Sequence, residues 1–407
     1  MKKLVFIFCI VSLTACSDSM VSEAGEGYDD VSANQPITPN DFDTNALIDN
    51  LVNTVFLPAF NQFESLANTQ TEIVTHYCQS VKNQENEDIN LKLESQTAWR
   101  DLVSQWQQIE VMQMGPLLEE ESKLRNAIYS WPVTNQCAVD QDVGHFEAGN
   151  ISGTPYDITK RTNTRRGLDA LEYLLFSPSL QHSCSNESLA PNNWNERTDL
   201  SRLIARCEYA IEVATDIKHS ANELVNQWQK TDGFSQELLF SGSSVSRFTD
   251  ESEVLNHISD AMFYIDNITK DTKLAAPIGL SANSCGSAAC HQDVESSLSE
   301  HSLQNIKYNL LALKQIITGG DNEALGFDDY LIALDAPVLA SDLLVDINNA
   351  IMAVDDFQGS MIAAVDNNPE SIQQIYIAIK KITDNLKSLF ITTLSLSLPL
   401  TSAGDAD

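Results

Sequence analysis

The chain has 407 residues, of which 24 are Lys or Arg and 57 are Asp or Glu, so its formal net charge is −33. Such an acidic surface repels nucleic-acid phosphates and anionic headgroups, and we expect no nucleic-acid partner. Hydrophobic residues make up 43% of the chain, too many for wholesale disorder, while 16 Gly and 12 Pro are too few for a collagen-like protein. We therefore expect a globular protein with one large or two ordinary domains.

The first sixteen residues resemble a bacterial lipoprotein signal. Two lysines precede an apolar run, Leu4 to Leu13, and the segment ends in Thr14-Ala15-Cys16. The run is shorter than the roughly 20 residues that span a bilayer, so it predicts a processing signal rather than a membrane helix. The resemblance implies a lipid on Cys16 that anchors the chain to the envelope membrane. Because Ser17 follows, we expect an outer-membrane lipoprotein facing the periplasm. A plain secretory signal with an incidental Cys16 is the alternative.

The remaining chain divides into a tether and a helical body. Residues 17–40 are polar and acidic without periodic apolar positions, which predicts a flexible tether. After residue 40, apolar residues recur at steps of three and four, as in helices that bury one face. The pattern predicts an all-α protein with two helical-bundle domains packed together, residues 41–240 and 241–407. The clearest stripes are Ile48, Leu51, Val52, Val55, Phe56, Phe60 and Phe63; Trp99, Leu102, Val103, Trp106 and Ile109; Leu339, Leu343, Leu344, Ile347, Ile351 and Val354; Ile372, Ile375, Ile379, Ile382, Leu386 and Leu389.

Six cysteines remain once the signal and Cys16 are set aside. An even number in an oxidising envelope predicts three disulfides, although six cysteines allow 15 pairings. The close pair Cys285 and Cys290 would staple a local loop, and its spacing is too long for a C-x-x-C metal site. The disulfide candidates are Cys78, Cys137, Cys184, Cys207, Cys285 and Cys290.

One short segment carries candidate ligands. In a helix, Asp169 and Glu172 are i, i+3 neighbours, so their carboxylates can converge on one cation. Ligation by oxygen alone favours Ca, Mg, Mn or iron over copper or zinc. The alternative is a solvated salt bridge from Asp169 to Arg165 or Arg166, which precede it by one turn.

The same segment, Gly167-Leu168-Asp169-Ala170-Leu171-Glu172, resembles the G-x-H-x-x-E motif of imelysin-like proteins. This envelope family includes iron-regulated proteins and a proposed insulin-cleaving peptidase. The similarity covers essentially the whole chain after the tether. Its other marks follow in the family's order: Trp99 to Gly115-Pro116, Trp131-Pro132, Asp140, Arg166 to Phe176, Lys273-Leu274, Pro277, Gly279, Glu295-Ser296, Ser299, Ser302 and Asn309.

The departure from the motif bears on function. Asp169 occupies the family's histidine position, and an ordinary aspartate stays anionic where an imidazole titrates near neutrality. This substitution argues against a peptidase and leaves binding of a hard cation open. We predict a protein that binds a cation or ligand in a cleft between the bundles. The resemblance implies a link to iron uptake, with iron or another hard divalent cation as cofactor and an iron-uptake protein as partner.

The predicted site residues fall into two groups, candidate metal ligands and candidate cleft residues. Asp169 and Glu172 are the candidate metal ligands, with Arg125, Arg166 and Glu295 as candidate cleft residues. A surface position is the alternative for Arg125, and a solvated one for Glu295. Two further functions remain open, a metal-dependent endopeptidase of imelysin type and a metal-free interaction scaffold. Five other family marks are predicted to be structural, as core tryptophans or helix N-caps: Trp99, Trp106, Trp131, Ser299 and Ser302.

Overall fold

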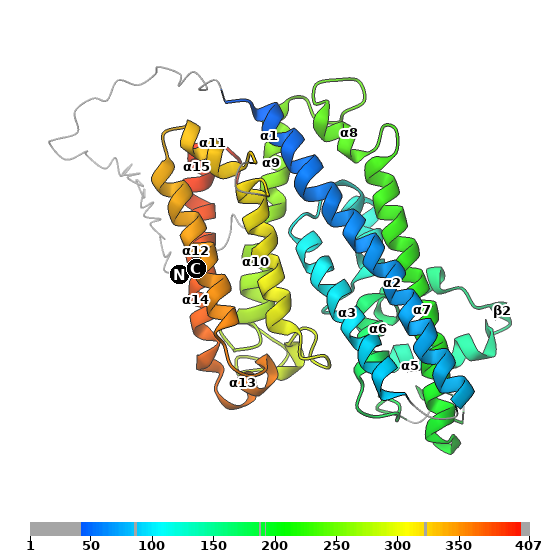
Figure 1. Ribbon diagram of the computed structural model, residues 1–407. Helices are drawn as coiled ribbons and strands as arrows, with labels where there is room; N and C mark the ends of the chain where they lie inside the picture. The colour runs from blue at the N-terminus through cyan, green and yellow to red at the C-terminus, as the bar shows by residue number, and fades with distance from the viewer. Residues whose placement is uncertain (1–41, 85–87, 187–188, 192, 321–323, 400–407) are drawn as a thin grey trace, which may run out of the picture. The chain divides into compact units, whose positions relative to one another are not determined.

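Long helices make up the first half of the chain (Figure 1). The computed structural model describes residues 42–84, 88–186, 189–191, 193–320 and 324–399. The predicted signal, Cys16 and the tether lie outside these ranges. The elements of this half are α1 (Thr44–Asn50), the π-helical η1 (Leu51–Phe56), α2 (Leu57–Gln84), α3 (Ile89–Glu110), η2 (Gly115–Leu117), α4 (Glu119–Ile128), α5 (Gln136–Ala148), β1 (Asn150–Ile151), β2 (Thr154–Pro155), η3 (Ile158–Lys160), η4 (Asn163–Arg165), α6 (Gly167–Phe176), η6 (Trp194–Glu196), α7 (Asp199–Gln229) and α8 (Phe234–Leu239).

Aromatic side chains fill the core of this half. Helix α2 lies between α3 and α7, and Figure 1 shows α2 and α7 side by side. Phe60 packs 4.5 Å from Trp228, and Phe63 packs 5.3 Å from Trp106, between ring centroids. All four side chains are buried. The apolar stripe of α2 therefore contacts both neighbours, as the three- and four-residue spacing requires.

The helices of the second half follow those of the first along the chain and pack mainly against one another. Helices α10, α12 and α14 pack in sequence, and η7 packs against α10 and α14. Its elements are α9 (Glu251–Met262), the π-helical η7 (Ile265–Ala275), η8 (His291–Asp293), α10 (Ser302–Thr318), α11 (Phe327–Ala333), α12 (Pro337–Asp355), α13 (Met361–Asn367), η9 (Pro369–Ser371), α14 (Gln373–Asn385), the π-helical η10 (Leu386–Phe390) and α15 (Ile391–Leu394).

The two groups of helices meet mainly through α3 and α10. Residues 41–407 accordingly form one compact unit. The all-α prediction is confirmed, because the sheet in the described ranges is the two-stranded hairpin β1–β2, which pairs Asn150 with Pro155. The division of this body into domains at residue 240 stays a prediction.

Three disulfides join the six predicted cysteines and resolve the pairing that the sequence left open. Cys78 of α2 is bonded to Cys207 of α7, which ties the two longest helices of the first half together. Cys137 at the start of α5 is bonded to Cys184. Cys285 and Cys290 close a short loop before η8, as expected from their spacing.

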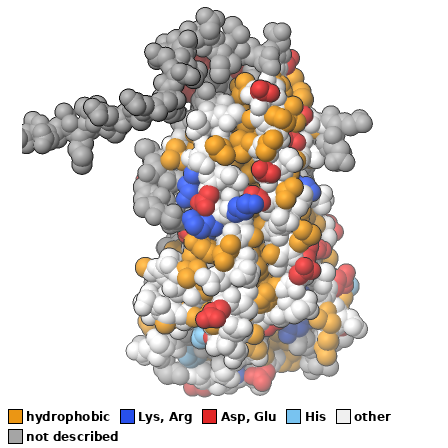
Figure 2. Space-filling model, turned by 90° about the vertical axis from the view of Figure 1, so that its left-hand side faces the viewer, with side chains coloured by type: hydrophobic (Ala, Val, Ile, Leu, Met, Phe, Trp, Pro, Cys, Tyr) orange, Lys and Arg blue, Asp and Glu red, His pale blue; other side chains and the backbone are white. Residues whose placement is uncertain are grey.

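Helix α12 is the one helix of the described chain that is long and apolar enough to cross a bilayer, by length and composition only. Core helices of soluble proteins pass the same test. Its inner face packs on α10 and α14. Its outer face exposes Val338, Val345 and Met352. Figure 2 shows hydrophobic side chains on this side of the molecule, interrupted by acidic and basic groups.

Candidate functional site

A glycine fixes the position at which α6 begins. Gly167 has φ +82°, in the left-handed region, and a Cβ there would lie 2.7 Å from the carbonyl oxygen of Ile128. Any larger residue would therefore push α6 away from the end of α4. This close approach places Asp169, in the first turn of α6, against the backbone that follows α4.

Asp169 is held through one carboxylate oxygen. Its Oδ2 accepts hydrogen bonds from the backbone N–H of Ser130 at 2.8 Å and of Trp131 at 3.2 Å. The side chain is only 7% exposed. Burial raises the pKa of Asp169 to about 7; the Ser130 N–H opposes this shift, and the charge of Glu295 adds to it. The described residues give Oδ1 no hydrogen-bond partner outside its own residue.

Glu172 is held in the same way by the second half of the chain. Its Oε1 accepts hydrogen bonds from the backbone N–H and the Oγ of Ser299, both at 2.8 Å. The side chain is 8% exposed, and burial raises its pKa to about 7. The two Ser299 bonds lower the pKa, whereas the neighbouring charges of Asp169 and Glu295 raise it.

Both serines near the start of α10 were expected to be helix caps, and this prediction is wrong. The N-cap residue of α10 is His301, without a capping side chain. Ser299 instead donates to Glu172, and Ser302 donates through Oγ to the backbone carbonyl of Glu295. These serines therefore bind the side chain of Glu172 and the backbone of Glu295 and do not cap α10.

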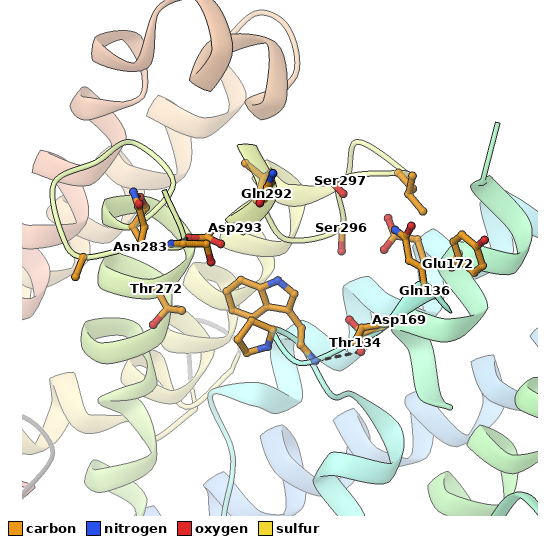
Figure 3. A pocket seen from close by; sticks show the side chains of 18 residues that line it. Thr134, Gln136, Asp169, Glu172, Thr272, Asn283, Gln292, Asp293, Ser296 and Ser297 are labelled. Atoms are coloured by element: carbon orange, nitrogen blue, oxygen red, sulfur yellow. Dashed lines mark hydrogen bonds between the residues drawn. The ribbon is translucent and has the colours of Figure 1, made fainter. Parts of the chain in front are cut away.

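Asp169 and Glu172 line one cavity of about 570 Å³. Figure 3 shows Asp169, Glu172, Thr134 and Gln136 on one side of it, with Asn283 and Asp293 across from them. The opposite wall belongs to η8 and to residues 282–284, which directly precede the loop closed by the Cys285–Cys290 disulfide. Trp99 and Trp106 are buried as expected, whereas Trp131 is partly buried, packs against the core and also lines this cavity.

The predicted salt bridge to Asp169 is not formed. Arg165 Nη1 lies 2.8 Å from Asp142 Oδ1, and Arg166 makes two 2.6 Å bonds to Asp216. Arg166 was predicted as a cleft residue, but it lines a different cavity of about 820 Å³ with Asp216. Both arginines are thus engaged elsewhere, and the carboxylates of α6 have no ion-pair partner within the described chain.

Arg125 and Glu295 lie in a buried network behind the cavity rather than in its wall. Arg125 Nη2 is 3.4 Å from Glu110 Oε1, and the side chain is 18% exposed. Glu295 is 1% exposed, so its predicted alternative as a solvated residue is wrong. Its Oε1 accepts from Tyr129 Oη at 2.6 Å and lies 3.1 Å from Lys273 Nζ.

Sequence reasoning missed most of this network. Lys273 also donates to Gln107 and, at 3.0 Å, to Asn309. Lys273 and Asn309 entered only as marks of the family, and Gln107 and Tyr129 were not singled out. For Gln107, Lys273 and Asn309 the signal is a polar residue on a helix with an apolar face, and many such residues serve only as satisfied core groups. Tyr129 follows the end of α4 and has no such signal.

These residues do not form the donor set of a resident catalytic metal. Within the part of the chain that the structure describes, no three His, Cys, Asp or Glu side chains are placed to hold one ion. A catalytic zinc site of the usual kind needs three such protein ligands.

Comparison with known proteins supports the family resemblance that the sequence motifs indicated. The Imelysin model of peptidase family M75 matches residues 57–389, most of the chain. The chain belongs to the imelysin family. No curated protein matches it.

Two solved structures share the fold of this imelysin-family chain. An imelysin-like protein from Psychrobacter arcticum 273-4 has a TM-score of 0.68 at 15% identity, covering 89% of this chain and 100% of its own. A protein from Parabacteroides distasonis ATCC 8503, named as a proposed iron-regulated protein A precursor, has a TM-score of 0.65 at 19% identity. That match covers 86% of this chain and 95% of the other.

Proposed function

We propose that this imelysin-family protein is an envelope binding protein that holds a positively charged ligand between Asp169 and Glu172. The iron-related name of the Parabacteroides distasonis protein supports a place in iron or other cation uptake. The lipoprotein-like segment that ends at Cys16 supports attachment to the outer membrane, facing the periplasm.

One observation carries the proposal. Two carboxylates, each more than nine-tenths buried, share a cavity and form no ion pair with a described residue. The charge of Arg125, which is itself paired with Glu110, only partly offsets the rise in the pKa of Asp169. Burying a charge without a partner is costly, and the raised pKa values of Asp169 and Glu172 express this cost. A cation in the cavity would remove it. The carboxylate oxygens without a partner are the groups that such a cation would contact.

Isothermal titration of the purified, chelator-free chain tests the proposal. The panel contains Fe²⁺, Mn²⁺, Ca²⁺ and simple alkylammonium ions, and the variant is Asp169→Asn/Glu172→Gln. We expect at least one cation to bind the wild-type chain and to lose about tenfold or more in affinity in the variant, which corresponds to about 1.4 kcal/mol.

The exposed carboxyl of Asp356 provides a matched control. Asp356→Asn removes one negative charge at the end of α12 and is expected to leave the affinity unchanged. If no cation in the panel distinguishes the wild-type chain from the double variant, the proposal is wrong.

A further inference from the structure

The cavity next to α6 is anionic on two sides. Besides Asp169 and Glu172, its lining includes Asp293 of η8, and no Lys, Arg or His is among the described residues that line it. Asp293 Oδ2 accepts a hydrogen bond from the backbone N–H of Ser284 at 2.8 Å, while Oδ1 has no partner in the described chain. None of the three carboxylates is in an ion pair with a described residue.

The carboxylates are separated across the cavity. Figure 3 shows Asp293 on the opposite side from Asp169 and Glu172. The rest of the lining includes apolar side chains, among them those of Trp131, Val294 and Leu298. A ligand that satisfies both sides therefore needs positive charge at two ends and an apolar middle.

A single metal ion does not match this arrangement. Metal–oxygen bonds to hard divalent cations are about 2.0–2.6 Å long, so one ion cannot contact carboxylates on two walls of a 570 Å³ cavity. The volume lies in the range of small-molecule sites. An aromatic wall is also a favourable surface for an organic cation, because the ring face attracts an ammonium group.

We propose that the ligand is an organic dication of the alkyldiamine class. One ammonium group binds between Asp169 and Glu172, the other binds Asp293, and the methylene chain lies along the apolar lining at Trp131. This inference rests on the proposed cation-binding function and names the ligand class of the same cavity.

Titration with matched amines tests the inference. The probes are putrescine and cadaverine, which carry two ammonium groups, and n-butylamine, which carries one on a similar chain. We expect the diamines to bind the wild-type chain about tenfold or more tightly than n-butylamine, since a second ion pair of about 1.4 kcal/mol gives that ratio.

Variants show which carboxylates bind each ammonium group of the diamine. Asp293→Asn should reduce diamine affinity to the level of n-butylamine and leave n-butylamine binding unchanged. Asp169→Asn/Glu172→Gln should weaken both classes, and the Asp356→Asn control should weaken neither. If the double variant does not fold, the comparison of amines on the wild-type chain and on Asp293→Asn still decides.

Four results would overturn the inference. Equal affinity for diamines and n-butylamine contradicts it, and so does unchanged diamine binding in Asp293→Asn. If Fe²⁺ or Mn²⁺ binds through Asp169 and Glu172 while the diamines do not, the ligand class is wrong and the proposed function stands. If no cation binds, both fail together.

Discussion

His301 is a buried imidazole at the start of α10 whose surroundings keep it neutral. Its Nε2 lies 2.9 Å from Ser104 Oγ of α3, and its ring packs edge-on to Trp99. Burial lowers the pKa of His301 from 6.5 to about 4, and the charge of Arg100 acts in the same direction. The residue thus joins α3 and α10 in a buried contact that disfavours the protonated ring.

We predict that His301 makes the fold sensitive to acid. A histidine with a depressed folded-state pKa supplies its full stability above about pH 6.5 and loses it as the pH falls toward 4. Between about pH 7.5 and about pH 5, the wild-type chain should lose about 2 kcal/mol relative to His301→Gln. Urea unfolding of both chains at the two pH values measures this difference, and parallel pH profiles would contradict it.

Glu172 should have the opposite pH dependence. Its pKa is raised from 4.5 to about 7, so the folded state retains a proton that the unfolded chain releases. The stability from this carboxyl is present at low pH and is lost as the pH rises through 7. The facing charged groups, Asp169 and Glu295, act in the same direction because they repel the ionised form.

Replacing this carboxyl should therefore stabilise the empty protein while it removes binding. Relative to Glu172→Gln, the ligand-free wild-type chain should lose about 2.5 kcal/mol between about pH 5 and about pH 8.5. Urea unfolding without added cations measures the effect. A variant that is less stable than wild type at the higher pH would show that Glu172 is chiefly a structural acceptor for Ser299.

At the scale of elements, local patterns were predictable and distant partners were not. The apolar stripe from Leu339 to Val354 lies within α12. It could be predicted because helical periodicity depends only on residues close together in the sequence. The pairing of Asp169 with Glu172 is local for the same reason. The Ser299 partner of Glu172 is 127 positions away, and no spacing rule connects them. Asp293 on the far wall was missed because only the fold brings η8 opposite α6.

The three disulfides differ in what they constrain. Cys78–Cys207 spans 129 positions between two long helices, whereas Cys285–Cys290 spans five in a loop that directly follows cavity-lining residues. In the chain-entropy model, the longer loop contributes about 4–5 kcal/mol and the shorter about 2 kcal/mol. Stability and ligand binding should therefore depend on different bonds.

We predict that removing each bond separates these effects. Cys78→Ala/Cys207→Ala should lower the free energy of unfolding by about 4 kcal/mol, and Cys285→Ala/Cys290→Ala by about 2 kcal/mol. Removing the second bond should also weaken ligand binding, since Asn283 and Ser284, which directly precede Cys285, line the cavity. Urea unfolding and amine titration measure the two effects, and equal losses of both in the two variants would argue against this division.

Across the whole molecule, a buried polar network connects the two groups of helices. The ion pair of Lys273 and Glu295, 3.1 Å apart, lies in the second group, and it contacts the first through Gln107 and Tyr129. Asn309 of α10 also donates to the backbone of Gln107 in α3 at 2.7 Å. Lys273 and Glu295 are each 1% exposed. Truncating one partner of a buried ion pair leaves the other charge without compensation, so these residues make the packing of the two groups conditional on their complete set of contacts.

A double-mutant cycle on Lys273→Met and Glu295→Gln should reveal this dependence. Lys273→Met alone should cost about 3–5 kcal/mol, because Glu295 then remains buried with only neutral partners, Tyr129 and Gln107. The double variant should lose less than the sum of the single losses, with a coupling of about 2 kcal/mol.

The matched control is Lys307–Asp355, a pair 2.6 Å apart and partly exposed, whose coupling should be below about 1 kcal/mol. Urea unfolding of the two cycles gives both values. Equal coupling would mean that solvent screens Lys273 and Glu295 as it does a surface pair, and that this ion pair does not set the network that contacts Gln107 and Tyr129 of the first half.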